Sequence, residues 1–133
     1  MSNSFFDKGR QKFLDGAINW MSDTIKAALV QGTYTPNLST NEFYTDLGSN
    51  VAGTPVALAS KTDTAGTADA ADVTFSSVPA GPACNYVVLY KDTGTGSTSP
   101  LIAIFDTATA GLPVTPSGGD ISVQWSGSGI FKL

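Results

Sequence analysis

The sequence predicts a mainly β protein, an antiparallel β-sandwich of jelly-roll or immunoglobulin-like type with a short N-terminal helix or arm. The 133 residues include 14 Gly and 7 Pro, but only 14% of the chain is charged. This composition is typical of a turn-rich β protein. Short apolar segments also recur at intervals of about ten to fifteen residues, as in sandwiches and small barrels. The length fits one domain, so we expect an arm or helix over residues 1–20 and a β-sandwich domain over residues 21–133.

The N-terminal segment has helical features. Ser4 and Asp7 have the spacing of a capping pair at a helix start, and Gly16 is suited to end the helix. The apolar residues that share one stripe at helical spacing are Phe6, Phe13, Leu14 and Ala17. Basic residues fall mostly outside this stripe, which makes the start of the chain locally basic.

Seven segments have strand patterns. They cover residues 24–30, 55–60, 72–78, 85–90, 100–105, 121–125 and 130–133. Residues 85–90 and 100–105 carry unbroken apolar runs, which predict central strands buried on both faces. Residues 72–78 and 121–125 alternate, which predicts strands with one buried face. Between the strands we expect a helical turn over 41–47, loops over 31–40, 91–99 and 107–120, and either a small-residue loop or a ragged hairpin over 61–71.

The composition argues against several kinds of site. The chain has no His and one Cys, Cys84, so His-dependent nucleophiles, an intrachain disulfide and a Cys-based zinc site are excluded. We expect Cys84 to be buried. The net charge of −4 does not suit a phosphate backbone, so we predict no direct nucleic-acid binding. No apolar stretch reaches about 18 residues and no leader pattern is visible, so we expect no membrane partner and synthesis in a cytoplasm.

Two acidic motifs point to chemistry, but each has a plainer interpretation. Asp92-Thr93-Gly94 follows an apolar strand, as in the aspartic-protease signature, where two carboxylates share one proton. Lys91 stands where that family has an apolar residue, and the triplet is also ordinary hairpin chemistry. Asp63, Asp69 and Asp72 supply oxygen ligands that suit Ca²⁺, but in no recognised ligand spacing. We therefore predict no enzyme, no cofactor and no metal site.

Short segments over nearly the whole chain carry a family resemblance. In the first half they are Phe6-Asp7-Lys8-Gly9, Phe13-Leu14-Asp15-Gly16, Ile18-Asn19-Trp20, residues 23–30, and Tyr34-Thr35-Pro36-Asn37 with Phe43. In the second half they are Lys61-Thr62, residues 68–75, residues 89–94, Pro113-Val114-Thr115-Pro116 and Gly119-Asp120-Ile121. Together they resemble small virion-associated proteins of tailed bacteriophages. None of these segments is a catalytic signature, so the resemblance depends on how much of the chain they cover and on the order in which they occur.

The resemblance implies a structural role on the virion, of the head-decoration or cement type. In this role the protein sits on the capsid surface, binds the lattice of the major capsid protein and stabilises the head. The resemblance also implies self-association, with a trimer as the expected state. The alternative is a tail or baseplate component that contacts the host or its glycans.

We expect the N-terminal segment to contact the capsid. A locally basic segment suits an acidic shell surface, because complementary charge favours both encounter and affinity. The candidate contact residues are Phe5, Phe6, Lys8, Arg10, Lys12, Phe13 and Trp20. Trp20 and Tyr34 flank the first long strand, and packing in the core is the competing interpretation for both.

Overall fold

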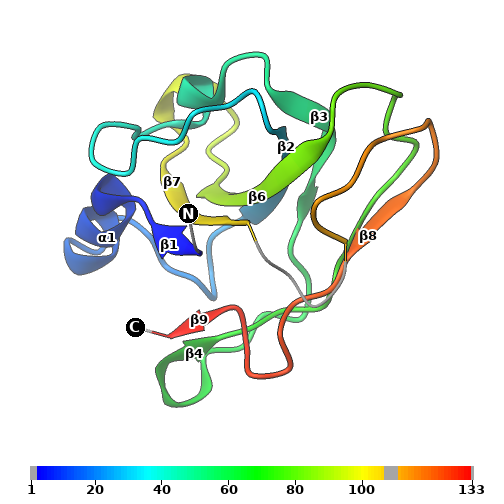
Figure 1. Cartoon of the computed structure of the whole chain (residues 1–133). Helices are drawn as coiled ribbons and strands as arrows, with labels where there is room; N and C mark the ends of the chain where they lie inside the picture. Colours follow the sequence, from blue (N-terminus) through cyan, green and yellow to red (C-terminus); the bar gives the residue numbers. More distant parts are fainter. Residues whose placement is uncertain (1–2, 107–110, 133) are drawn as a thin grey trace.

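The computed structural model describes residues 3–106 and 111–132 and is built around a five-stranded sheet with the order β1-β7-β6-β2-β3 (Figure 1). Every neighbouring pair in this sheet is antiparallel. Its strands are β1 (Ser4–Phe5), β2 (Ile25–Gln31), β3 (Val51–Ala57), β6 (Cys84–Lys91) and β7 (Leu101–Phe105). Two small ladders pair β4 (Thr67–Ala68) with β9 (Phe131–Lys132) and β5 (Val73–Phe75) with β8 (Ile121–Val123). The prediction of a mainly β, antiparallel protein is confirmed.

The described helices are short. The α-helix α1 (Asp7–Leu14) follows β1, and the remaining ones are the 3-10 turns η1 (Tyr44–Leu47), η2 (Thr64–Gly66) and η3 (Gly96–Thr98). None of the helices in residues 3–106 and 111–132 is long and apolar enough to cross a membrane.

The central strands are buried on both faces of the sheet. On one face, the first core cluster includes Ala27, Leu29, Val87 and Leu89. On the other face, the second core cluster includes Ala28, Val30, Val88 and Tyr90. Each set alternates along β2 and β6, so consecutive side chains enter opposite clusters. The unbroken apolar runs therefore predicted doubly buried strands correctly.

Different elements cover the two faces. The first cluster is completed by the β5–β8 ladder together with Trp20 and Trp125. The second cluster is completed by side chains from connecting segments, among them Phe6, Tyr34 and Leu47. Short ladders and loops thus take the place of a second full sheet, and a jelly-roll or immunoglobulin-like sandwich is not confirmed.

A bulge in β7 provides the contact surface for α1. Leu89 pairs with Ala103 and Tyr90 with Leu101, which leaves Ile102 as an extra residue in β7. The carbonyl oxygen of Ile102 accepts a hydrogen bond from the Phe6 N–H at 3.0 Å. A Cβ on Gly9 would lie 2.6 Å from the Leu101 carbonyl oxygen. The helix can approach the strand this closely because residue 9 has no side chain.

A second irregularity shapes the edge strand β3. Ala27 pairs with Val56 and Leu29 with Ala52, so Gly53-Thr54-Pro55 lies opposite the single residue Ala28. Gly53 has a φ of +66°, which favours glycine at this position. This bulge explains why the predicted strand over 55–60 is wrong: β3 begins four residues earlier, ahead of the glycine and proline that interrupt its pattern.

Several boundaries also differ from the predictions. Ser4 does not cap α1 but lies in β1, and the N-cap position is Phe6, without a side-chain hydrogen bond. The helical turn predicted over 41–47 is observed as η1. The strands predicted over 72–78, 121–125 and 130–133 contract to β5, β8 and β9. Residues 107–110 of the predicted loop and Leu133 of the last predicted strand lie outside the described residues.

Cys84 behaves as predicted. It is a free thiol with no exposed surface, at the start of β6. Burial raises the pKa of this thiol, which disfavours the reactive thiolate.

We predict that Gly9→Ala lowers the free energy of unfolding by about 1–3 kcal/mol, because the added methyl group meets the β7 backbone. Helix propensity alone would favour Ala by about 1 kcal/mol, so a net loss identifies the contact with β7. Chemical denaturation measures the change, and Gln11→Ala at an exposed position of α1 is the control. Equal stability of the two variants would contradict this packing.

Candidate functional site

Phe131 in β9 joins aromatic rings from distant parts of the chain. Its ring centroid lies 4.8 Å from that of Phe5 in β1, 5.1 Å from that of Trp20 and 6.1 Å from that of Phe13 in α1. All these pairs meet edge to face, the arrangement that aromatic quadrupoles favour. The last described strand is therefore fixed against the N-terminal segment, and the two lie side by side in Figure 1.

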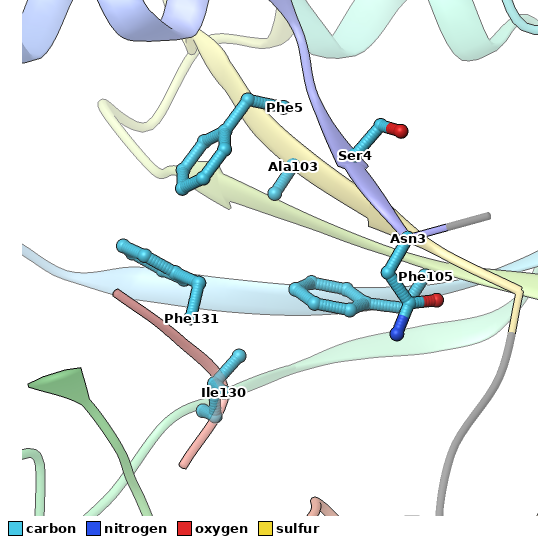
Figure 2. Close-up of a pocket in the computed structure, with 7 residues that line it drawn as sticks. All are labelled: Asn3, Ser4, Phe5, Ala103, Phe105, Ile130 and Phe131. Atoms are coloured by element: carbon cyan, nitrogen blue, oxygen red, sulfur yellow. The ribbon is translucent and has the colours of Figure 1, made fainter. Parts of the chain in front are cut away.

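A small hollow separates β9 from the main sheet. It measures about 200 Å³, and Figure 2 shows the Phe5 and Phe131 rings next to one another among the residues that line it. Ala103 and Phe105 of β7 and Ile130 complete its apolar part. The hollow is smaller than the 300–1,000 Å³ that small-molecule sites usually occupy, so it is best explained as a packing gap between β9 and the sheet.

A larger hollow is lined by two of the rings that contact Phe131, namely Phe5 and Phe13. We call it the α1 groove; it measures about 500 Å³ and is lined by Phe5, Arg10, Phe13, Leu14 and Lys132. The side chain of Leu14 is 89% exposed at the edge of this groove. One exposed leucine is ordinary on a protein surface, but here it lies beside two aromatic rings in the same hollow.

Two cationic side chains border the α1 groove. The Arg10 guanidinium lies 5.3 Å from the centroid of the Phe5 ring, within cation–π range, and its Nη1 is 3.0 Å from Asp7 Oδ1. Lys132 in β9 forms no ion pair within residues 3–106 and 111–132. The groove therefore combines aromatic contact area with positive charge.

The structure divides the predicted contact residues into three groups. Phe5, Arg10 and Phe13 meet at the α1 groove. Lys8 and Lys12 lie one turn apart on another side of α1, since successive helical residues are rotated by about 100°. Lys12 Nζ lies 3.7 Å from Glu42 Oε2, whereas Lys8 has no ion-pair partner in the described part of the chain. The positive charge predicted for the N-terminal segment is thus partly neutralised by acidic side chains of the same chain.

The other two predicted contact residues are inside the protein. Phe6 has no exposed surface and belongs to the second core cluster. Trp20 is 7% exposed, and its indole Nε1–H donates to the Thr62 carbonyl oxygen at 3.0 Å. These side chains support the core and are not available on the surface. Tyr34 is also buried, and burial raises its pKa to about 12.

Leu14 and Lys132 were not among the predicted contact residues. The sequence places Leu14 in an apolar stripe with Phe6 and Phe13, but α1 ends at Leu14 and the sheet does not extend beneath it. Lys132 reaches the groove only because β9 pairs with β4, with Ala68 opposite Phe131. In the sequence, the weak amphipathic pattern around Phe13 is the local feature that could have pointed to Leu14 as a contact residue. No local feature points to Lys132.

The Asp92-Thr93-Gly94 motif lies in the connection between β6 and β7, as the hairpin interpretation expects. Asp92 Oδ2 is 2.9 Å from Lys26 Nζ, and Oδ1 accepts the Gly94 N–H at 3.0 Å. The hydrogen bond from Lys26 lowers the pKa of this carboxyl, with a further contribution from the Gly94 N–H. The carboxylate holds the turn and ties it to β2.

Two of the three aspartates considered for Ca²⁺ accept hydrogen bonds from backbone N–H groups. Asp72 Oδ1 accepts the Trp125 N–H and Asp69 Oδ1 accepts the Ala70 N–H, each at 2.9 Å. In the part of the chain that the structure describes, no three Asp, Glu, Cys or His side chains are grouped to hold a metal ion.

Comparison with protein-family models, with curated proteins and with solved structures finds no match for this chain. The functional argument therefore rests on the sequence and the geometry of the chain itself. Within that geometry, the α1 groove is the strongest candidate for a functional site, because it combines an exposed leucine, aromatic rings and two cations.

We predict that Phe131→Leu lowers the free energy of unfolding by about 1–3 kcal/mol, because it removes the edge contacts to the surrounding rings. Leu14→Ala removes a side chain that is 89% exposed and should change stability by no more than about 0.5 kcal/mol. Chemical denaturation of both variants measures the difference. If both changes cost the same, β9 is not held by its aromatic contacts.

The Lys26–Asp92 pair predicts an acid-dependent loss of stability. The folded pKa of Asp92 is lowered, so its contribution is present above the unfolded pKa of about 4 and is lost as the pH falls through the folded pKa. Both side chains are partly exposed, 32% and 25%, so we expect no more than about 1 kcal/mol. Unfolding measured from pH 6 to pH 2 should show a smaller loss for Asp92→Asn than for the wild type. Identical curves would contradict the assignment.

Proposed function

We propose that this protein is a structural protein of the phage virion that decorates the head, binds the lattice of the major capsid protein and stabilises the shell. The observation that carries the proposal is the surface of α1, which exposes an apolar side chain, aromatic area and cations together. The resemblance of ordered segments along the chain to small virion proteins supports the same role.

The chemistry of this surface suits another protein as the partner. Aromatic residues and Arg are enriched at protein interfaces, where they supply contact area and directed hydrogen bonds. The groove has Phe5, Phe13 and Arg10. An exposed leucine at its edge gains free energy only when a partner covers it, at about 25 cal/mol per Å² of apolar surface.

The position of α1 also suits attachment to a lattice. The helix is held on the sheet by the Gly9 contact and by the Phe6 hydrogen bond, so its backbone keeps one position relative to the sheet. Lys8 adds a positive charge without an internal ion-pair partner among the described residues. On a repeating acidic shell, contacts of modest strength add up when neighbouring copies are linked.

Copy number and position in purified particles test the proposal. We expect a quantitative gel to show one set of copies for each repeating unit of the head. Electron cryo-microscopy should show α1 facing the shell. Stripping the protein should lower the thermal and osmotic stability of the heads. A few copies on the tail would instead support the tail or baseplate role. Absence of the protein from particles would overturn both roles.

A charge variant tests the contact itself. We predict that Lys8→Gln lowers occupancy on heads several-fold, because it removes the cation of α1 that has no ion-pair partner in the described part of the chain. Thr54→Glu changes the net charge by the same amount at an exposed position of β3 and should bind as the wild type does. Equal occupancy of the two variants at low and high salt would contradict a shell contact through Lys8.

A further inference from the structure

We infer that the α1 groove is a self-association site, in which Leu14 and Asp15 of a second copy of this chain occupy the groove and the two copies form a two-fold dimer. This inference goes beyond the proposed function: a second copy covers the α1 groove, and the shell contact then rests on Lys8, which lies on another side of α1. It follows from the match between what the groove can bind and what the same surface exposes.

The groove has two requirements for its occupant. Its floor is formed by Phe5 and Phe13, which favour an apolar side chain. Its borders carry Arg10 and Lys132, which favour a carboxylate close to that side chain. Arg10 already contacts Asp7 Oδ1, but a guanidinium has five N–H donors and can bind a second carboxylate. The best occupant is therefore an apolar residue with an acidic neighbour.

This chain exposes such a pair at the end of α1. Leu14 is 89% exposed and Asp15, the next residue, is exposed as well. Asp15 Oδ1 accepts the Ala17 N–H at 3.1 Å, which holds the carboxylate in place and leaves Oδ2 to meet a cation. Leu14 and Met21 are the large hydrophobic side chains exposed in the described part of the chain, and only Leu14 lies beside a groove with complementary charge.

The position of Leu14 determines the symmetry. Leu14 itself lines the groove, so the inserting side chain and the receiving surface belong to one patch. A patch that is complementary to itself forms an isologous contact, which closes as a two-fold dimer. Each Leu14 then lies on the aromatic floor of the other copy, and each Asp15 faces the cations of the other copy. The groove volume of about 500 Å³ accommodates a leucine and the adjacent carboxylate.

The expected trimer is therefore replaced, in this inference, by a dimer. A trimer needs two different patches that meet head to tail, whereas this surface combines both halves of the contact. The oligomeric state in solution therefore distinguishes the two-fold dimer from the trimer, whether or not the protein occurs on phage heads.

The first experiment measures mass in solution for the full chain, by light scattering after size exclusion and by sedimentation velocity over a range of concentrations. We expect the wild type to be a dimer and Leu14→Asp to be a monomer. Met21→Asp is the matched control, because Met21 is 46% exposed and lies outside the groove, and it should remain a dimer. Far- and near-UV circular dichroism checks that each variant is folded. A monomeric or trimeric wild type would overturn the inference.

A charge exchange tests the pairing of Asp15 with Lys132. Asp15→Lys and Lys132→Glu, each alone, place like charges across the contact and should weaken dimerisation about tenfold or more. An equimolar mixture restores opposite charges at both symmetry-related contacts, so a heterodimer should form with nearly the wild-type dissociation constant. Two monomeric variants that fail to associate when mixed would show that these residues do not face each other.

Discussion

A sheet with apolar side chains on both faces has to be covered on both faces, and this constraint shapes the whole protein. β2 and β6 bury consecutive side chains into opposite clusters, and β7 contributes side chains to both clusters. Water on either face would cost about 25 cal/mol for each Å² of apolar surface left exposed. The ladders, the tryptophans and the connecting segments can all be understood as cover for this sheet, and the N-terminal segment is part of that cover because Phe6 closes the second cluster.

The candidate site is a consequence of this cover. The bulge at Ile102 directs a carbonyl oxygen toward Phe6, and Gly9 lets α1 approach the same place. Phe13 is thereby held against Phe131, whereas Leu14 extends beyond the sheet and stays exposed. The α1 groove thus exists because the first turns of the helix are fixed and its last residue has nothing beneath it. A helix whose backbone is already held in place loses little backbone entropy on binding, which favours recognition.

The sequence predicted the elements that depend on local pattern. The apolar runs over 85–90 and 100–105 identified β6 and β7, since burial on both faces leaves an uninterrupted pattern. Pairing could not be predicted, because β5 meets β8 across a separation of 48 residues between Thr74 and Ser122. The contact residues show the same limit. Phe5, Arg10 and Phe13 were named from local composition, whereas Lys132 joins them only through the tertiary fold.

The bulge at Gly53-Thr54-Pro55 has a consequence for the edge of the sheet. β3 is an edge strand, and an intact edge would offer its free N–H and C=O groups to a strand from another molecule. Proline has no N–H to donate, and the bulge breaks the regular spacing of the remaining groups. At the opposite edge, β1 is only two residues long. The bulge and Pro55 therefore make β3 a poor template for edge-to-edge pairing with another molecule.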